Sequence, residues 1–64
     1  MDPNTALANM RAAIAEYRRV DAERESGLAT FARLAEIGAE IAESADALDG
    51  WVSRGGFLPS AWQR

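Results

Sequence analysis

Residues 31–52 read FARLAEIGAEIAESADALDGWV, and the spacing of their apolar residues decides the fold. Small or apolar residues recur there at alternating steps of three and four, the heptad pattern of a helix that buries one stripe. This seam consists of Phe31, Leu34, Gly38, Ile41, Ala45, Leu48 and Val52. Ile37 widens the seam on one side, and most charged residues fall on the opposite face. The pattern predicts a helix over about residues 27–54.

A second apolar stripe precedes this seam. Asp2 and Pro3 are typical of a helix start, because a carboxylate can cap the first amides and proline needs no hydrogen bond there. Four apolar residues follow at steps of three and four, namely Leu7, Met10, Ile14 and Tyr17. Residues 21–27 lack an apolar face and end in a Ser-Gly loop signal. We therefore expect a helix over about residues 3–20 and a connection within residues 20–27.

The second helix is predicted to stop at a pair of glycines, Gly55 and Gly56. With Gly56 in the left-handed conformation, Phe57 can pack back on Val52, as in a Schellman motif. Residues 55–64 then form a short tail that caps the end of the hairpin.

These elements predict an all-α protein, an antiparallel two-helix hairpin with a C-terminal capping tail, in a single domain of residues 1–64. A core this small rarely supplies more than about 3–5 kcal/mol, so we expect a homodimer in a four-helix arrangement with the seam at its centre.

The alternative to the hairpin is one long helix. It would place Asp21 and Arg24 in the stripe and Gly27 in the helix interior, at about 1 kcal/mol relative to Ala.

The residue types available argue against catalysis. The chain has neither Cys nor His, which removes thiol chemistry, zinc–thiolate sites and the commonest general base. Glu36, Glu40 and Glu43 share a face, but it lies opposite the apolar seam, so we interpret them as a solvated acidic surface. We expect no catalytic residue, no metal site and no cofactor.

Charge and hydropathy narrow the range of partners. The net charge is −3, whereas nucleic-acid-binding domains normally carry a basic face. Arg11, Arg18 and Arg19 could form a small basic patch, which keeps a nucleic-acid-associated regulator open as an alternative. No apolar run approaches the roughly 20 residues of a membrane span, and no secretory signal is evident, so we expect a cytoplasmic protein without a membrane partner.

The C-terminal segment concentrates large apolar residues beyond the seam. Trp51, Phe57, Leu58 and Trp62 lie within twelve residues of one another. They can fold back over the last core layer of the hairpin, or they can anchor a partner as aromatic residues do at interfaces. The two interpretations are compatible if only part of the tail is covered.

Residues 47–62, ALDGWVSRGGFLPSAW, resemble the ending of a family of very short proteins of actinobacteria and their phages. The opening Met1-Asp2-Pro3-Asn4 is similar to that family too. Family members often carry Leu where this chain has Val52, and an Asp/Glu-rich connection where residues 21–27 are shorter and mixed with Arg. The family has no assigned activity, so the resemblance implies a bacterial or phage origin and brings no functional residues.

The leading functional hypothesis is a non-enzymatic, self-associating protein-binding module, such as a phage-encoded modulator of a host protein. The absence of catalytic groups and the apolar tail motivate it. A structural subunit of a larger assembly is a further alternative.

Overall fold

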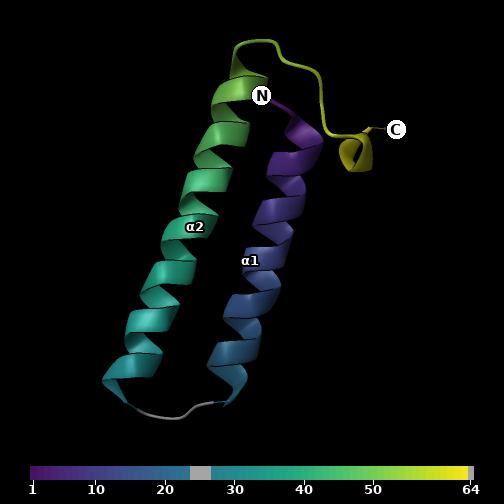
Figure 1. The fold of residues 1–64 in the computed structure, drawn as a ribbon. Coiled ribbons are helices and arrows are strands. Elements are labelled where there is room, and N and C mark those ends of the chain that lie inside the picture. Colours follow the sequence, from purple (N-terminus) through teal and green to yellow (C-terminus); the bar gives the residue numbers. More distant parts are fainter. Residues whose placement is uncertain (24–26, 64) are drawn as a thin grey trace.

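A computed structural model describes residues 1–23 and 27–63 of the chain. Helix α1 spans Pro3–Glu23, helix α2 spans Leu28–Ser53, and a short 3₁₀ turn, η1, spans Ser60–Trp62. The two long helices lie antiparallel, side by side (Figure 1). The chain is therefore an all-α hairpin, which rules out the single long helix.

Helix α1 begins as the sequence predicts and ends later. It continues three residues beyond the expected end at residue 20, and the part of the predicted connection at residues 24–26 lies outside the described residues. Ion pairs, rather than apolar contacts, accompany this extension of the helix. Arg19 forms ion pairs with Glu16 at 2.6 Å and with Glu23 at 3.0 Å, one turn to either side, which supports a last turn that has no buried face.

The start of α1 is capped by Asp2. The backbone N–H of Asn4 donates to Oδ1 of Asp2 at 2.9 Å, and the Thr5 hydroxyl donates to Oδ2 at 3.0 Å. These two bonds, the Thr5 hydroxyl foremost, lower the pKa of Asp2 below its ordinary value of 3.8. Glu16 is held below its ordinary pKa of 4.5, chiefly by the hydrogen bond from Arg19.

These lowered pKa values make the fold weakly acid-sensitive. Because the folded chain binds the two protons less tightly than the unfolded chain does, both carboxylates stabilise the fold above their ordinary pKa values. That stabilisation is lost as the pH falls through the lowered values. We expect the melting temperature to stay level down to about pH 5 and to fall below about pH 4, as followed by circular dichroism. An Asp2→Asn, Glu16→Gln chain should show a smaller decline, and an equal decline would contradict this origin.

The core is a thin line of side chains between the helices. Ile37 has no exposed surface, and Leu48 and Leu7 each retain 3%. The face of α2 turned toward α1 is thus centred on Ile37 and Leu48, so it is rotated away from the middle of the predicted seam. Phe31, the first residue of that seam, is 67% exposed.

The end of α2 confirms a Schellman motif but moves it by one residue. Gly55, not Gly56, has the left-handed conformation, with a φ of +88°. The Gly55 N–H donates to the carbonyl of Val52 at 3.0 Å, and the Gly56 N–H donates to that of Trp51 at 2.9 Å. Arg54 caps the helix, so the left-handed residue is its immediate neighbour. The Phe57 ring packs on Trp51, the residue before the predicted Val52.

Candidate functional site

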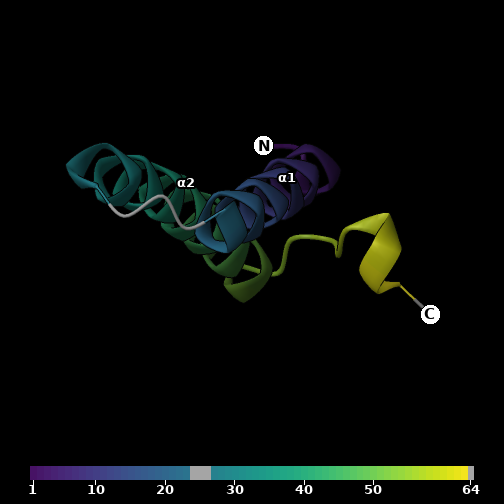
Figure 2. The same ribbon diagram turned by 90° about the horizontal axis from the view of Figure 1, so that it is seen from below.

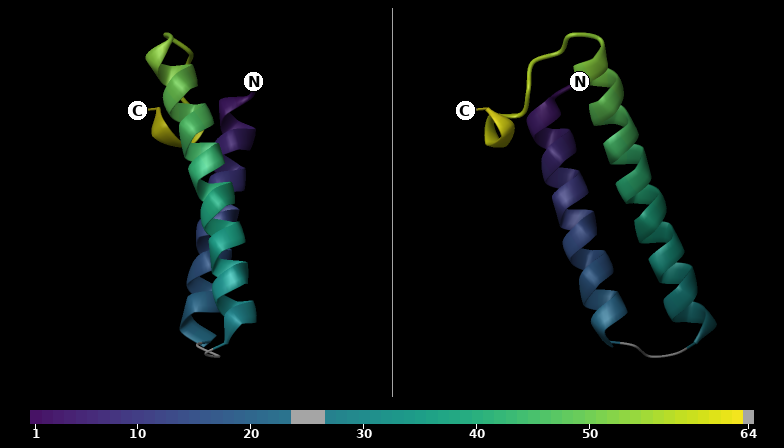
Figure 3. Two further views of the ribbon diagram at one scale, coloured as in Figure 1. Left: turned by 90° about the vertical axis from the view of Figure 1, so that its left-hand side faces the viewer. Right: turned by 180° about the vertical axis from the view of Figure 1, so that it is seen from behind.

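The tail is docked on the start of α1. After α2 the chain passes over the end of the hairpin, and η1 lies beside α1 on the side away from α2 (Figures 1 and 3). The backbone N–H of Ser60 donates to Oδ1 of Asn4 at 2.7 Å, a bond that joins residues 56 positions apart. Pro59 is among the fully buried residues. The tail therefore folds back on the hairpin, as the lid interpretation expects, but it docks on the start of α1.

Trp51 holds the tail at its other end. Its indole N–H donates to the carbonyl of Phe57 at 2.9 Å, and the two rings pack edge to face with centroids 5.5 Å apart. Gly56 lies against the same indole, since a Cβ at this position would overlap the ring. The half-buried Trp51 thus has a structural role in the hairpin itself.

The outer side chains of the tail remain accessible. The exposed fractions are 60% for Phe57, 40% for Leu58 and 41% for Trp62. Three of the four residues predicted to bind a partner are thus available to one, because the tail buries Pro59 and leaves these larger side chains in part exposed.

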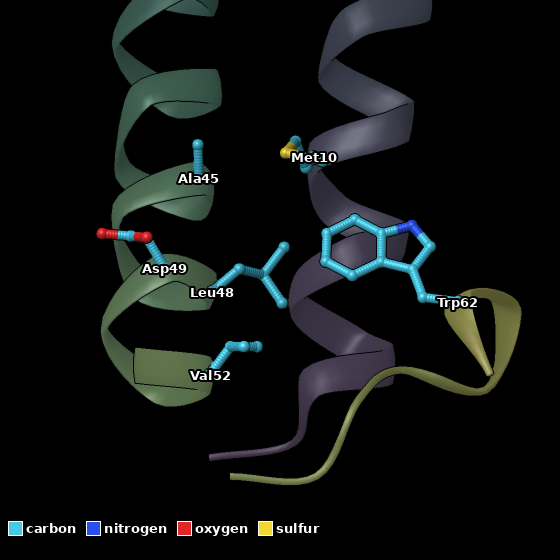
Figure 4. Close-up of a pocket in the computed structure, with 6 residues that line it drawn as sticks. All are labelled: Met10, Ala45, Leu48, Asp49, Val52 and Trp62. Carbon is cyan, nitrogen blue, oxygen red and sulfur yellow. The ribbon is translucent and has the colours of Figure 1, made fainter. Parts of the chain in front are cut away.

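Trp62 also forms one wall of an apolar groove between the helices. The groove holds about 250 Å³. Its lining residues are Met10, Ala45, Leu48, Asp49, Val52 and Trp62. Figure 4 shows the Trp62 ring reaching across α1 toward Leu48. Ala45, Leu48 and Val52 belong to the predicted seam, whereas the contributions of Met10 and Asp49 were not anticipated, because they depend on how α1, α2 and η1 converge.

A second hollow between the helices has a more polar lining than the groove. Its lining residues are Asn9, Ala12, Ala13, Glu16, Arg33 and Glu40. Arg33 bridges the two helices there, 3.6 Å from the carboxylate of Glu16, and it also pairs with Glu36 at 3.4 Å. On a helical projection of α2 at 100° per residue, Arg33 and Glu40 fall on one side of Ile37, and Ala45 and Val52 fall on the other. The hairpin therefore has a polar face and an apolar face.

The ion pairs of Arg19 with Glu16 and Glu23 weaken the predicted basic patch of Arg11, Arg18 and Arg19. The pKa of Arg19 is raised, chiefly by its hydrogen bond with Glu16, as expected for a guanidinium between two carboxylates. Arg11 and Arg18 are exposed seven residues apart on α1, and Arg19 projects about 100° away from Arg18. The three residues do not form one uniformly basic surface.

Within residues 1–23 and 27–63 there is no group of three or more acidic side chains arranged to hold a metal ion. Neither long helix is both long enough and apolar enough to cross a bilayer, as judged over the same residues. No protein-family model matches the chain, and comparison with curated proteins and with solved structures finds no match. The function must therefore be inferred from the surfaces described above.

Proposed function

We propose that this chain is a non-enzymatic protein-binding module that acts through the apolar face of its hairpin. The observation that carries the proposal is the groove, whose accessible lining is mainly apolar and which opens to solvent beside the exposed rings of the tail. Contiguous apolar surface of this kind, rimmed by polar residues, is typical of protein interaction sites. The residue types of the chain support a binding role over catalysis, since neither Cys nor His is present.

The groove is better suited to a side chain than to a cofactor. Its volume of about 250 Å³ lies below the roughly 300–1,000 Å³ of small-molecule sites. Among the described residues of its lining, Asp49 on α2 is the one that carries a charge. A partner that inserts an apolar side chain and leaves Asp49 in water fits both properties.

A co-purification experiment tests this function. Ala45 is an exposed groove residue, and Ala12 is its exposed counterpart on the polar face. Tagged wild-type, Ala45→Arg and Ala12→Arg chains are expressed together with an untagged copy of the chain in an actinobacterium, the source that the C-terminal resemblance suggests. We expect wild type and Ala12→Arg to retain the same proteins, the untagged copy included, and Ala45→Arg to lose them, because arginine places a charge in the groove. Equal retention by all three chains, or by none, would refute the proposal.

A further inference from the structure

The hairpin exposes more surface than a compact protein of its mass. Its dimensions are 43 × 20 × 13 Å, so it is a layer one helix deep (Figure 2). Its radius of gyration is 13.9 Å, whereas about 10.7 Å is typical of a compact chain of this length. The chain exposes 4699 Å², against about 4,000 Å² for a folded monomer of 6.9 kDa. The excess of about 700 Å² is close to the roughly 800 Å² that each partner buries in a standard interface.

Part of the exposed surface lies along α2 on the apolar face. Phe31, Gly38, Ala45 and Val52 follow one another at steps of seven, so they form one stripe along the helix. Phe31 and Ala45 are exposed, and a Cβ added at Gly38 would have no atom within 4 Å. Helix α1 therefore leaves the middle of this stripe open.

We propose that the occupant of the apolar face is a second copy of this chain, packed with its α2 antiparallel across the stripe. This inference rests on the proposed function and names its partner. The order of side chains along the stripe is large, small, small, large, which reads the same when the helix is reversed. A two-fold axis between Ile41 and Ala42 therefore places Phe31 opposite Val52 of the second copy and Gly38 opposite its Ala45. The small residues on either side of the axis, Gly38 and Ala45, allow the two helices to approach closely, and the interface is isologous and closed.

This register carries Phe31, the most exposed large apolar residue that the structure describes, into the groove. Val52 lines the groove, so Phe31 of the second copy, which lies opposite it, enters between α2 and Trp62. An apolar protein cavity of about 150 Å³ is enough to hold benzene, and the groove offers about 250 Å³. Each copy then fills the groove of the other, and Phe31 and Trp62 lose their exposure together.

The oligomeric state gives the first test. By light scattering at micromolar concentration, wild type and Ala12→Arg should have the mass of a dimer. Phe31→Ala and Ala45→Arg should dissociate at least tenfold more readily, because they remove the inserted ring or charge the groove. Phe31 and Ala45 are exposed in the single hairpin, so helical content by circular dichroism should be retained in both variants.

Single cysteines test the orientation of the two copies. The chain contains no Cys, so an introduced thiol can cross-link only to another copy. Ala42 and Ala35 are exposed residues one heptad apart on α2. In the antiparallel register Ala42 faces its own equivalent near the axis, whereas the two copies of Ala35 lie 13 residues apart along the helix, about 20 Å at 1.5 Å per residue. A disulfide needs Cα atoms within about 7 Å, so Ala42→Cys should oxidise to a covalent dimer and Ala35→Cys should not.

The possible outcomes separate this inference from the proposed function. If wild type is a monomer, a second copy is not the partner. The proposed function is then tested by the co-purification alone: it is supported if another protein is retained by wild type and lost by Ala45→Arg, and refuted otherwise. A dimer in which both cysteine variants cross-link refutes the antiparallel register. A dimer that neither Phe31→Ala nor Ala45→Arg weakens refutes this face as the interface.

Discussion

Replacing Ile37 with Asp should unfold the hairpin. Ile37 has no exposed surface and lies at the centre of the contact between α1 and α2. A carboxylate there has to be buried without a partner or drive the helices apart, and a buried unpaired charge costs several kcal/mol. Because a core of this size supplies no more than about 3–5 kcal/mol, the expected loss equals or exceeds the total stability. Circular dichroism should show loss of most helical signal at 25 °C and of any cooperative thermal transition.

Ala39→Asp is the matched control for this substitution. Ala39 is exposed on the same helix two residues further on, so the same carboxylate meets water there. The change then costs about 0.5 kcal/mol of helix propensity and about 0.5 kcal/mol of repulsion from Glu36 and Glu43. The control should therefore melt within a few degrees of wild type. A folded Ile37→Asp chain with a similar melting temperature would show that the contact between α1 and α2 does not hold the hairpin together.

Replacing Gly56 with Ala should release the tail. A methyl group at Gly56 would overlap the indole of Trp51, so either the ring must turn or the chain after α2 must move away. Both changes break the hydrogen bond from Trp51 to Phe57 and their edge-to-face contact. Overpacking of this kind typically costs about 1–3 kcal/mol. We expect a lower melting temperature and, in a Trp62→Phe background, a red shift of the Trp51 emission as the indole becomes hydrated.

Gly27→Ala serves as the control for the loss of a glycine. Gly27 precedes α2 in extended conformation, with a φ of −165°, and a Cβ there would have no atom within 4 Å. Any residue can adopt that conformation, but Gly27 is the N-cap of α2 and Ala is a weaker N-cap. The melting temperature should therefore fall by a few degrees, while the Trp51 emission stays that of wild type. An unchanged emission spectrum of Gly56→Ala would mean that the tail does not depend on the packing of Trp51 against Gly56.

Local features of the fold could be predicted from the sequence because their causes lie within a few residues of one another. The apolar periodicity predicts both helices, Asp2-Pro3 predicts the start of the first, and the two glycines predict the stop of the second. The end of α1 was predicted too early because its last turn has no apolar face and is supported by the ion pairs of Arg19. The left-handed residue could not be assigned between Gly55 and Gly56, since both lack a Cβ and only the backbone path distinguishes them.

Two features of the fold depend on the tertiary structure alone. The first is the rotation of α2. The apolar stripe of this helix is too wide for one neighbouring helix to cover, so either edge of it can face inward. Packing against α1 buries Ile37 and leaves Phe31 in water. The second is the position of the tail, because the bond from Ser60 to Asn4 joins the two ends of the chain and leaves no signal in the residues around either one. The sequence by itself therefore determined two amphipathic helices and an aromatic tail. It predicted the hairpin with one long helix as the alternative, and the packing of α1 against α2 excludes that alternative. Which apolar residues remain for a partner depended on long-range packing, and the candidate site is made of those residues.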